Sequence, residues 1–319
     1  MTQRTHAAES EVPADAVERA RLRTGYARRL GLSAEAEAAL RRGEHAAFED
    51  LVAAHVAAIP FENARVIRGA RIRTDALGAV RRIVDDGAGG VCYELNGALA
   101  WLLGEIGLCP RLWAAEVRRG DPPPRGSDSS EERWGIPAGH GCLEVPRPGG
   151  ALLVDVGFGG EGIVGRMVGA GHRVTSPTGR LYRVSGPVPG LEAFAPGAAW
   201  HSTSPDSRFT GSLVVSVTGR DATRTLVGSP GPGRIRGGGG GDRAGAGGVQ
   251  GDGIGSRAFV FSSLVTSRGG DREERRLTRE QAARFARTEL GFAEELPSHA
   301  VSADASSSAP EPGPVHLHG

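Results

Sequence analysis

The chain has 319 residues with 38 basic and 37 acidic side chains, and its formal net charge of +1 gives no reason to expect nucleic acid or an acidic membrane surface as a partner. Its 39% of hydrophobic residues can bury a sizeable core, divided over two or three domains. Only three cysteines, no apolar leader and no apolar run of about 18 residues favour a cytoplasmic protein without disulfides or membrane spans.

The first part of the chain has the composition of helices. Residues 16–31 and 34–58 are rich in Ala, Glu, Arg and Leu, which favour helices. The pair Thr74-Asp75 offers an N-cap for a further amphipathic helix. These segments predict a helical domain over residues 16–107, preceded by a disordered leader over residues 1–15.

Cys92 follows a glycine-rich turn and begins the last helix of that domain. Apolar residues recur after it with helical spacing, at Leu95, Leu99, Leu102, Leu103 and Ile106. In the first turn of a helix, unpaired backbone N–H groups and the positive end of the helix dipole stabilise a thiolate, which is the nucleophilic form of cysteine. A buried packing cysteine is the competing interpretation.

Two short strands downstream carry the polar residues that a nucleophilic thiol needs. Residues 140–145 begin with His140, and residues 152–156 include Asp155, with residues 146–150 as the expected hairpin loop. An imidazole can hold a thiolate and carry its proton, and a carboxylate can fix the tautomer of the imidazole. An ordinary strand histidine and a turn aspartate are the alternative.

The register of this hairpin decides whether the two side chains can meet. Pairing of Glu144 with Ala151 would place His140 opposite Asp155 on one face of the sheet. Pairing of Val145 with Ala151 would direct them to opposite faces.

The remaining pattern predicts further strands and a last helix. The predicted strands cover residues 112–117, 181–184, 213–217 and 259–265. Thr278 and Gln281 form a capping box for a helix over residues 279–290. We therefore expect a β domain over residues 108–215, which carries His140 and Asp155, and a C-terminal part over residues 216–298.

Two segments have compositions that predict disorder. Residues 228–256 are almost wholly Gly, Pro, Arg, Ala and Asp, and residues 299–319 are rich in Ser, Ala and Pro. Neither can bury enough apolar area to offset its chain entropy. The first of them would interrupt the C-terminal part.

Six segments, in chain order, resemble sequence signatures of the arylamine N-acetyltransferase family, and together they extend over residues 20–298. They are Tyr26–Leu30, Ala58–Asn63, Gly89–Gly97, Asp155–Gly159, Ser202–Phe209 and Thr278–Phe292. Several independent signatures in the right order are more specific than any single motif. The resemblance implies an α+β fold with an N-terminal helical bundle, a central antiparallel β-barrel-like domain and a C-terminal α/β lid around a cysteine-proteinase-like core.

The resemblance also implies a ping-pong acetyl transfer from acetyl-CoA to an arylamine, arylhydrazine or similar nitrogen acceptor. Cys92 would be the nucleophile that forms an acetyl-Cys92 intermediate, His140 the general base and acid, and Asp155 the residue that orients the imidazole. The backbone amide of Cys92 is the first candidate for stabilising the oxyanion.

Substrate contacts follow from the same resemblance. Phe61, Phe158 and Phe209 match positions that line the family's acceptor pocket, although core packing is an equal interpretation for each. Gly159 and Gly160 match the place where CoA phosphates approach the backbone. The implied partners are a small-molecule acceptor and acetyl-CoA, with no nucleic acid or membrane, in a monomer or homodimer. The dispersed histidines and cysteines lack metal-ligand spacing, so no metal is expected.

The chain departs from the family at Ala88, where an arginine usually precedes the glycine pair. If that arginine normally pairs with a carboxylate such as Glu62, its loss leaves the acid in need of another partner. Arg65 and Arg68 are the candidates that the sequence offers.

Two other functions share these residues. An amide synthase that closes a macrolactam from a polyketide thioester would use the same three side chains with a different donor and acceptor. A non-catalytic relative that binds small molecules would need none of the chemistry.

Overall fold

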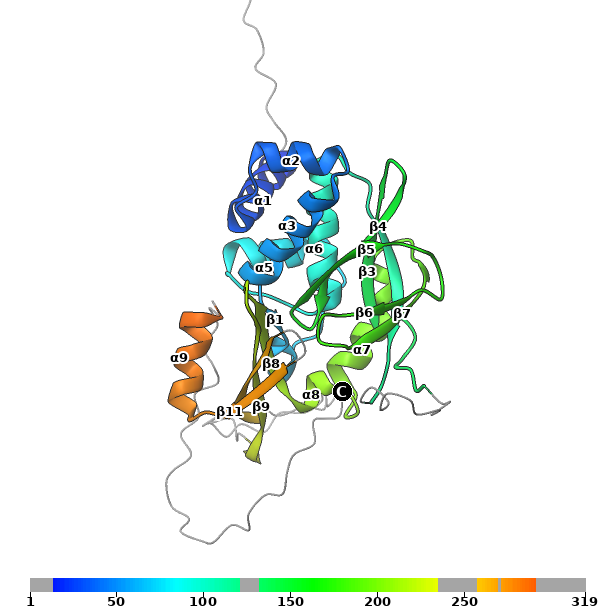
Figure 1. The fold of residues 1–319 in the computed structure, drawn as a ribbon. Coiled ribbons are helices and arrows are strands. Elements are labelled where there is room, and N and C mark those ends of the chain that lie inside the picture. Colours follow the sequence, from blue (N-terminus) through cyan, green and yellow to red (C-terminus); the bar gives the residue numbers. More distant parts are fainter. Residues whose placement is uncertain (1–13, 121–131, 235–256, 269–270, 291–319) are drawn as a thin grey trace, which may run out of the picture.

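The computed structural model describes residues 14–120, 132–234, 257–268 and 271–290 (Figure 1). The predicted tail and nearly all of the predicted leader lie outside these residues. The first helix begins at Ala14, inside the segment expected as a leader.

Six helices form the N-terminal part of the fold. They are α1 (Ala14–Leu30), α2 (Ala34–Arg41), α3 (His45–Ala58), α4 (Ala64–Ile67), α5 (Ala76–Asp85) and α6 (Cys92–Glu105). The run predicted over residues 34–58 is therefore two helices, divided near Gly43. Asp75 caps α5 as expected, because its side chain accepts a hydrogen bond from the Gly78 amide at 2.6 Å. Helix α6 contacts α5 on one side and strands β3 and β4 on the other.

An antiparallel sheet of six strands packs against α6. Its strands are β2 (Arg111–Val117), β3 (His140–Arg147), β4 (Gly150–Phe158), β5 (Glu161–Arg166), β6 (Arg173–Thr175) and β7 (Leu181–Pro187). The order is β5-β4-β3-β2-β7-β6, so β5 and β6 are the two edges. The expected barrel-like antiparallel domain is thus an open, curled sheet that resembles half a barrel.

The hairpin of β3 and β4 adopts neither of the two registers considered from the sequence. Pro146 pairs with Ala151, and Leu143 pairs with Val154. The connection is shorter than expected because the strands continue to Arg147 and Gly150, which leaves two residues for the turn. Relative to the pairing of Glu144 with Ala151, this register is shifted by two residues. A shift of two keeps every side chain on its face.

A second antiparallel sheet has the order β1-β8-β9-β10-β11. Its strands are β1 (Phe61–Glu62), β8 (Leu213–Thr218), β9 (Thr223–Arg234), β10 (Arg257–Arg268) and β11 (Asp271–Arg276). The expectation of disorder is wrong for residues 228–234, which pair with β10 through backbone hydrogen bonds that need no apolar side chains. Residues 235–256 lie outside the described part of the chain.

Helix α9 (Arg279–Glu289) covers one face of this second sheet. The predicted capping box is confirmed, because Thr278 and Gln281 exchange hydrogen bonds between side chain and backbone. The covered face and the helix form an apolar cluster of Leu213, Val215, Val217, Leu226, Leu264, Ala282, Ala286 and Leu290. The opposite face carries hydroxyl groups, of which Ser216 pairs with Thr225 at 2.8 Å and Thr218 with Thr223 at 2.8 Å.

The connection between the two sheets is helical, which the sequence did not indicate. It contains η1 (Leu191–Phe194), α7 (Ala195–Thr203) and α8 (Arg208–Gly211). Within the described residues, none of the helices is long and apolar enough to cross a membrane. The mixed α and β class is confirmed. The expected domain boundaries remain an interpretation, because β1 comes from the helical part and pairs with β8.

Candidate functional site

The thiol of Cys92 lies where the helices meet the six-stranded sheet. Cys92 is the first residue of α6 and is buried. Glu94 caps this end of the helix, because its Oε2 accepts a hydrogen bond from the Val91 amide at 3.2 Å. Gly157 of β4 packs directly on residues 89–92, which lead into α6 and which we call the nucleophile turn after its candidate nucleophile, Cys92. A Cβ added at Gly157 would lie 2.6 Å from the Cα of Cys92. Only a residue without a side chain permits this approach.

His140 and Asp155 share the face of the sheet that carries Cys142 and Leu153, and the His140 side chain also hydrogen-bonds Cys92. The His140 and Asp155 side chains are offset by one diagonal step in the register, and the Nε2 of His140 lies 2.7 Å from the Oδ2 of Asp155. Both residues are buried. The other carboxylate oxygen, Oδ1, accepts hydrogen bonds from the Asn96 side chain and from the Gly157 amide, each at 2.8 Å.

These contacts set the charges of the pair. Burial raises the pKa of Asp155, but the charge of His140 and the hydrogen bonds from His140, Asn96 and Gly157 hold it below its ordinary value. Burial lowers the pKa of His140, but Asp155 and a hydrogen bond with Cys92 outweigh it and raise that pKa to about 10. Because Nε2 faces Asp155, the nitrogen left for Cys92 is Nδ1. The arrangement favours an imidazolium beside the Asp155 carboxylate.

Aromatic rings enclose the imidazole of His140. The Phe158 ring lies 5.1 Å from it and the Tyr182 ring 4.8 Å, measured between centroids. The guanidinium of Arg180 lies over the outer face of Phe158, 4.4 Å from its centroid. Phe158 therefore shields His140 from the side that Arg180 occupies.

The other two predicted aromatic residues form a separate pair. The ring centroid of Phe209 lies 5.9 Å from that of Phe61 and 4.9 Å from that of His201. Tyr93, next to the thiol, approaches His201 at 6.1 Å. The structure thus brings Phe61 and Phe209 together and places Phe158 against the histidine.

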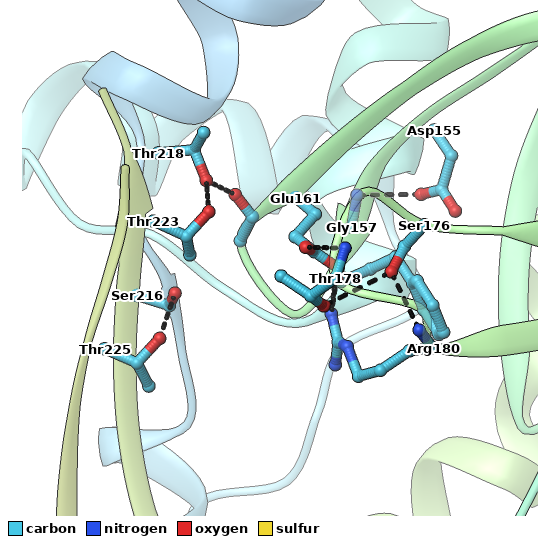
Figure 2. Close-up of polar contacts among 12 residues, drawn as sticks. Asp155, Gly157, Glu161, Ser176, Thr178, Arg180, Ser216, Thr218, Thr223 and Thr225 are labelled. Atoms are coloured by element: carbon cyan, nitrogen blue, oxygen red, sulfur yellow. Dashed lines mark hydrogen bonds and ion pairs between the residues drawn. The ribbon is translucent and has the colours of Figure 1, made fainter. Parts of the chain in front are cut away.

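The glycine pair predicted to meet CoA forms the turn between β4 and β5. Gly159 and Gly160 have φ values of 65° and 89°, a conformation that favours glycine. The space that a Cβ would fill is taken at Gly159 by the Arg180 guanidinium and at Gly160 by the Ser216 hydroxyl. Thr218 donates a hydrogen bond to the Gly160 carbonyl, so this turn rests on the hydroxyl-bearing face of β8 (Figure 2).

Arg82 forms an ion pair with Glu62, whose partner the sequence did not identify. Its Nη2 lies 3.1 Å from Glu62 Oε1, and its Nη1 lies 2.9 Å from Glu94 Oε1. Arg65 is one of the two residues that the sequence offered as a partner for Glu62. Its Nη1 instead lies 3.6 Å from the Oε1 of Glu94. A charged group thus reaches the nucleophile turn from α5 rather than from position 88.

Four of these residues were missed from the sequence: Asn96, Arg82, Arg180 and His201. Asn96 follows Cys92 by one helical turn, and this spacing was the available signal, since residues four apart share a helix face. The other three reach the site only through the tertiary fold. Among the described residues, no group of three or more His, Cys, Asp or Glu side chains is placed to hold a metal ion.

Comparisons with known proteins agree with this fold. The chain matches a family model described as N-acetyltransferase over residues 45–188. It is 31% identical over 139 residues to an uncharacterized acetyltransferase of Bacillus subtilis, which covers 43% of this chain and 51% of the relative. It is 35% identical over 144 residues to the arylamine N-acetyltransferase of Mycolicibacterium smegmatis, which covers 43% of this chain and 46% of the relative. Its fold is similar to that of the Mycobacterium marinum arylamine N-acetyltransferase in complex with CoA, with a TM-score of 0.59 and 23% identity over 85% of this chain and 92% of that chain.

Over residues 45–188 the chain is thus similar to N-acetyltransferases. Among these it resembles the arylamine N-acetyltransferases, the family whose signatures the sequence contains. In these alignments the chain spans about half the length of the two curated relatives, so the similarity does not by itself assign its activity, substrates or partners.

Proposed function

We propose that the protein transfers an acetyl group from acetyl-CoA to an arylamine, an arylhydrazine or a similar nitrogen acceptor through an acetyl-Cys92 intermediate. The observation that carries the proposal is the buried imidazole of His140, which is hydrogen-bonded to Asp155 through one nitrogen and to Cys92 through the other. This is the order of contacts that activates a nucleophile through a base held by an acid.

The chemistry divides into two transfers. In the first, His140 holds the proton of Cys92, the Cys92 thiolate attacks the acetyl carbonyl, and the CoA thiolate leaves and takes that proton from His140. In the second, the amine nitrogen attacks the acetyl-Cys92 carbonyl, His140 accepts the amine proton, and the Cys92 sulfur is released. Asp155 holds the imidazole in one tautomer and stabilises its charged form. We expect the first-turn backbone amide of Cys92 to donate to the oxyanion of each tetrahedral intermediate.

The donor would reach the thiol past the turn of Gly159 and Gly160. A CoA complex is known for the Mycobacterium marinum relative. In this chain, Arg180 provides a guanidinium beside that turn, where it also pairs with Glu161 at 3.1 Å. A guanidinium suits a phosphate-bearing donor.

The acceptor would lie against the aromatic residues on the other side of the thiol. Phe61 and Phe209 offer ring faces on which a flat aromatic amine can stack, and Phe158 closes the side nearest His140. His201 adds a polar edge beside Phe209. We expect a monomer or homodimer that acts in the cytoplasm, where its three free cysteines stay reduced.

Intact-mass spectrometry after mixing with acetyl-CoA tests this proposal. The unmodified protein should gain one acetyl group and lose it when an arylamine such as 4-aminosalicylate is added. Cys92→Ala should gain none, whereas Cys109→Ala, at an exposed cysteine outside the site, should behave as the unmodified protein. Turnover of a long acyl thioester without acetyl transfer would favour the amide synthase. No adduct with either donor would favour the non-catalytic relative.

A further inference from the structure

Two buried carboxylates share one guanidinium directly behind the nucleophile turn. The side chains of Glu62, Glu94 and Arg82 are 1%, 7% and 11% exposed. Arg82 uses separate nitrogens for the two acids, at 3.1 Å from Glu62 and 2.9 Å from Glu94. A planar guanidinium can bridge two carboxylates in this way, whereas the point charge of a lysine cannot hold both with the same geometry.

Each acid uses its second oxygen to hold backbone near the site. Glu94 Oε2 accepts from the Val91 amide at 3.2 Å, and Glu62 Oε2 accepts from the Ala64 amide at 2.7 Å. The Glu62 amide donates to the Gly90 carbonyl at 3.0 Å. Arg82 therefore connects α5 to β1 and to the turn that presents Cys92.

The charges around this turn oppose a thiolate unless they are balanced. The ionisable groups on the elements packed against it include Arg29 of α1, which donates to the Gly87 carbonyl, Glu62 of β1, Arg65 of α4, Arg82 of α5, Tyr93 and Glu94 of α6, His140 of β3 and Asp155 of β4. Three of these are carboxylates. Negative charge within a few ångströms disfavours a second negative charge, more strongly in a buried site than in water.

We infer that Arg82 is a positioning residue for Cys92. It holds Glu94 as the cap of α6 and offsets the charge of Glu62 and Glu94, and in this way it sets the pH range in which Cys92 reacts as a thiolate. The inference rests on the proposed function only in taking Cys92 as the nucleophile. It concerns a charge that enters from α5, outside the three residues that perform the transfer.

The pH dependence of Cys92 alkylation by iodoacetamide tests the inference without substrate. Peptide mass spectrometry follows Cys92 separately from Cys109 and Cys142. Arg82→Met should shift the profile upward by about one pH unit, which is a roughly tenfold slower reaction on the acid side. Arg82→Lys keeps the positive charge but loses the planar guanidinium that binds both carboxylates, so it should shift the alkylation profile less than Arg82→Met. Arg81→Met, at an exposed neighbour on α5 that pairs with Glu18, is the matched control and should not shift it.

The carboxylate variants separate a charge effect from a loss of structure. Glu94→Gln removes a negative charge and keeps an oxygen for the Val91 amide, so it should shift the profile to lower pH. Arg82→Met combined with Glu94→Gln should return the profile toward that of the unmodified protein, whereas a purely structural role would leave the double variant at least as slow as Arg82→Met.

Circular dichroism establishes that each variant is folded. An unshifted profile in folded Arg82→Met, or no recovery in the double variant, would overturn the inference. If Arg82→Met does not fold, the opposite shifts expected for Arg82→Lys and Glu94→Gln still decide it. Because alkylation needs neither acetyl-CoA nor an acceptor, failure of acetyl transfer with the expected shifts would count against the proposed function alone.

Discussion

Asp155 is fully buried, yet its carboxylate has donors on both oxygens. His140 approaches one oxygen, and Asn96 and the Gly157 amide approach the other. A buried carboxylate without such donors would carry a large desolvation penalty. Asn96 and the Gly157 amide orient the Asp155 carboxylate, and that carboxylate in turn orients the imidazole of His140.

Asp155→Asn tests the role of this carboxylate. An amide placed toward His140 presents a donor where an acceptor is needed, so the imidazole turns to the wrong tautomer while the fold is kept. We expect the rate of Cys92 acetylation to fall by about 10³- to 10⁴-fold. Asp85→Asn, at an exposed aspartate that pairs with Arg21, should retain the rate. Full activity in Asp155→Asn would show that another group orients His140.

Gly157→Ala tests the close approach of β4 to the nucleophile turn. The added Cβ would lie 2.6 Å from the Cα of Cys92 and 2.7 Å from the Nδ2 of Asn96, and neither can move without disturbing the site. We expect a loss of about 1–3 kcal/mol in the free energy of unfolding, measured in urea, together with slower acetylation of Cys92. Gly165→Ala on β5 meets no atom within 4 Å and is the control. Equal stability of the two variants would contradict the packing argument.

The elements themselves followed from the sequence where periodicity and capping agreed. The helix at Cys92, the helix after Asp75 and the last helix have apolar spacing with a cap, and the structure has all three. Four strands of the six-stranded sheet, β2, β3, β4 and β7, were located within a few residues, whereas β5 and β6 were not predicted. The half-barrel curvature was not predicted either, because it depends on which strands become edges.

The hairpin shows why register is harder to predict than strand position. Pro146 pairs with Ala151 although the sequence marked it as part of the loop. Strand β2 pairs with β3 only up to Glu144, so proline at position 146 removes no hydrogen bond to β2. The shift of two residues preserved the shared face of His140 and Asp155. The candidate site was therefore predictable from alternation even though its exact pairing was not.

Contacts that join distant segments were beyond sequence reasoning. Arg82, Arg180 and His201 lie near the thiol through tertiary packing, with no local pattern that points to it. The strand at residues 228–234 was missed for a related reason, because its pairing with β10 comes from backbone groups that any composition provides.

Thr278→Ala tests how much the cap of α9 contributes. The Thr278 side chain accepts from the Gln281 amide, and loss of such a cap costs about 1 kcal/mol. Because α9 covers the apolar face of the second sheet, we expect that decrease in the free energy of unfolding in urea. Thr288→Ala, near the other end of the same helix, is the control for loss of a threonine side chain. Equal decreases in both variants would argue against a specific capping effect.

At the scale of the whole molecule, the site lies where three parts of the chain meet. Helix α6 supplies Cys92, the six-stranded sheet supplies His140 and Asp155, and β1 and α8 bring Phe61 and Phe209 from the edge of the second sheet. The family model matches residues 45–188, which include the three candidate catalytic residues, while the fold similarity extends over 85% of the chain. All three parts thus contribute residues to the candidate site.

The buried pair at the centre of this assembly makes its stability depend on pH. The pKa of His140 rises from 6.5 to about 10 on folding, so its contribution is complete below about pH 6.5 and is lost as the pH rises toward 10. The pKa of Asp155 falls below 3.8 on folding, so its contribution is present above that value and is lost as the pH falls through the folded value. Together they stabilise the fold most between about pH 4 and 6.5. Urea unfolding at about pH 6, 8 and 10 should show a declining free energy of unfolding, and Asp155→Asn should flatten the decline because it removes the group that raises the pKa of His140. An equal decline in Asp155→Asn and in the unmodified protein would mean that groups outside this pair govern the alkaline loss.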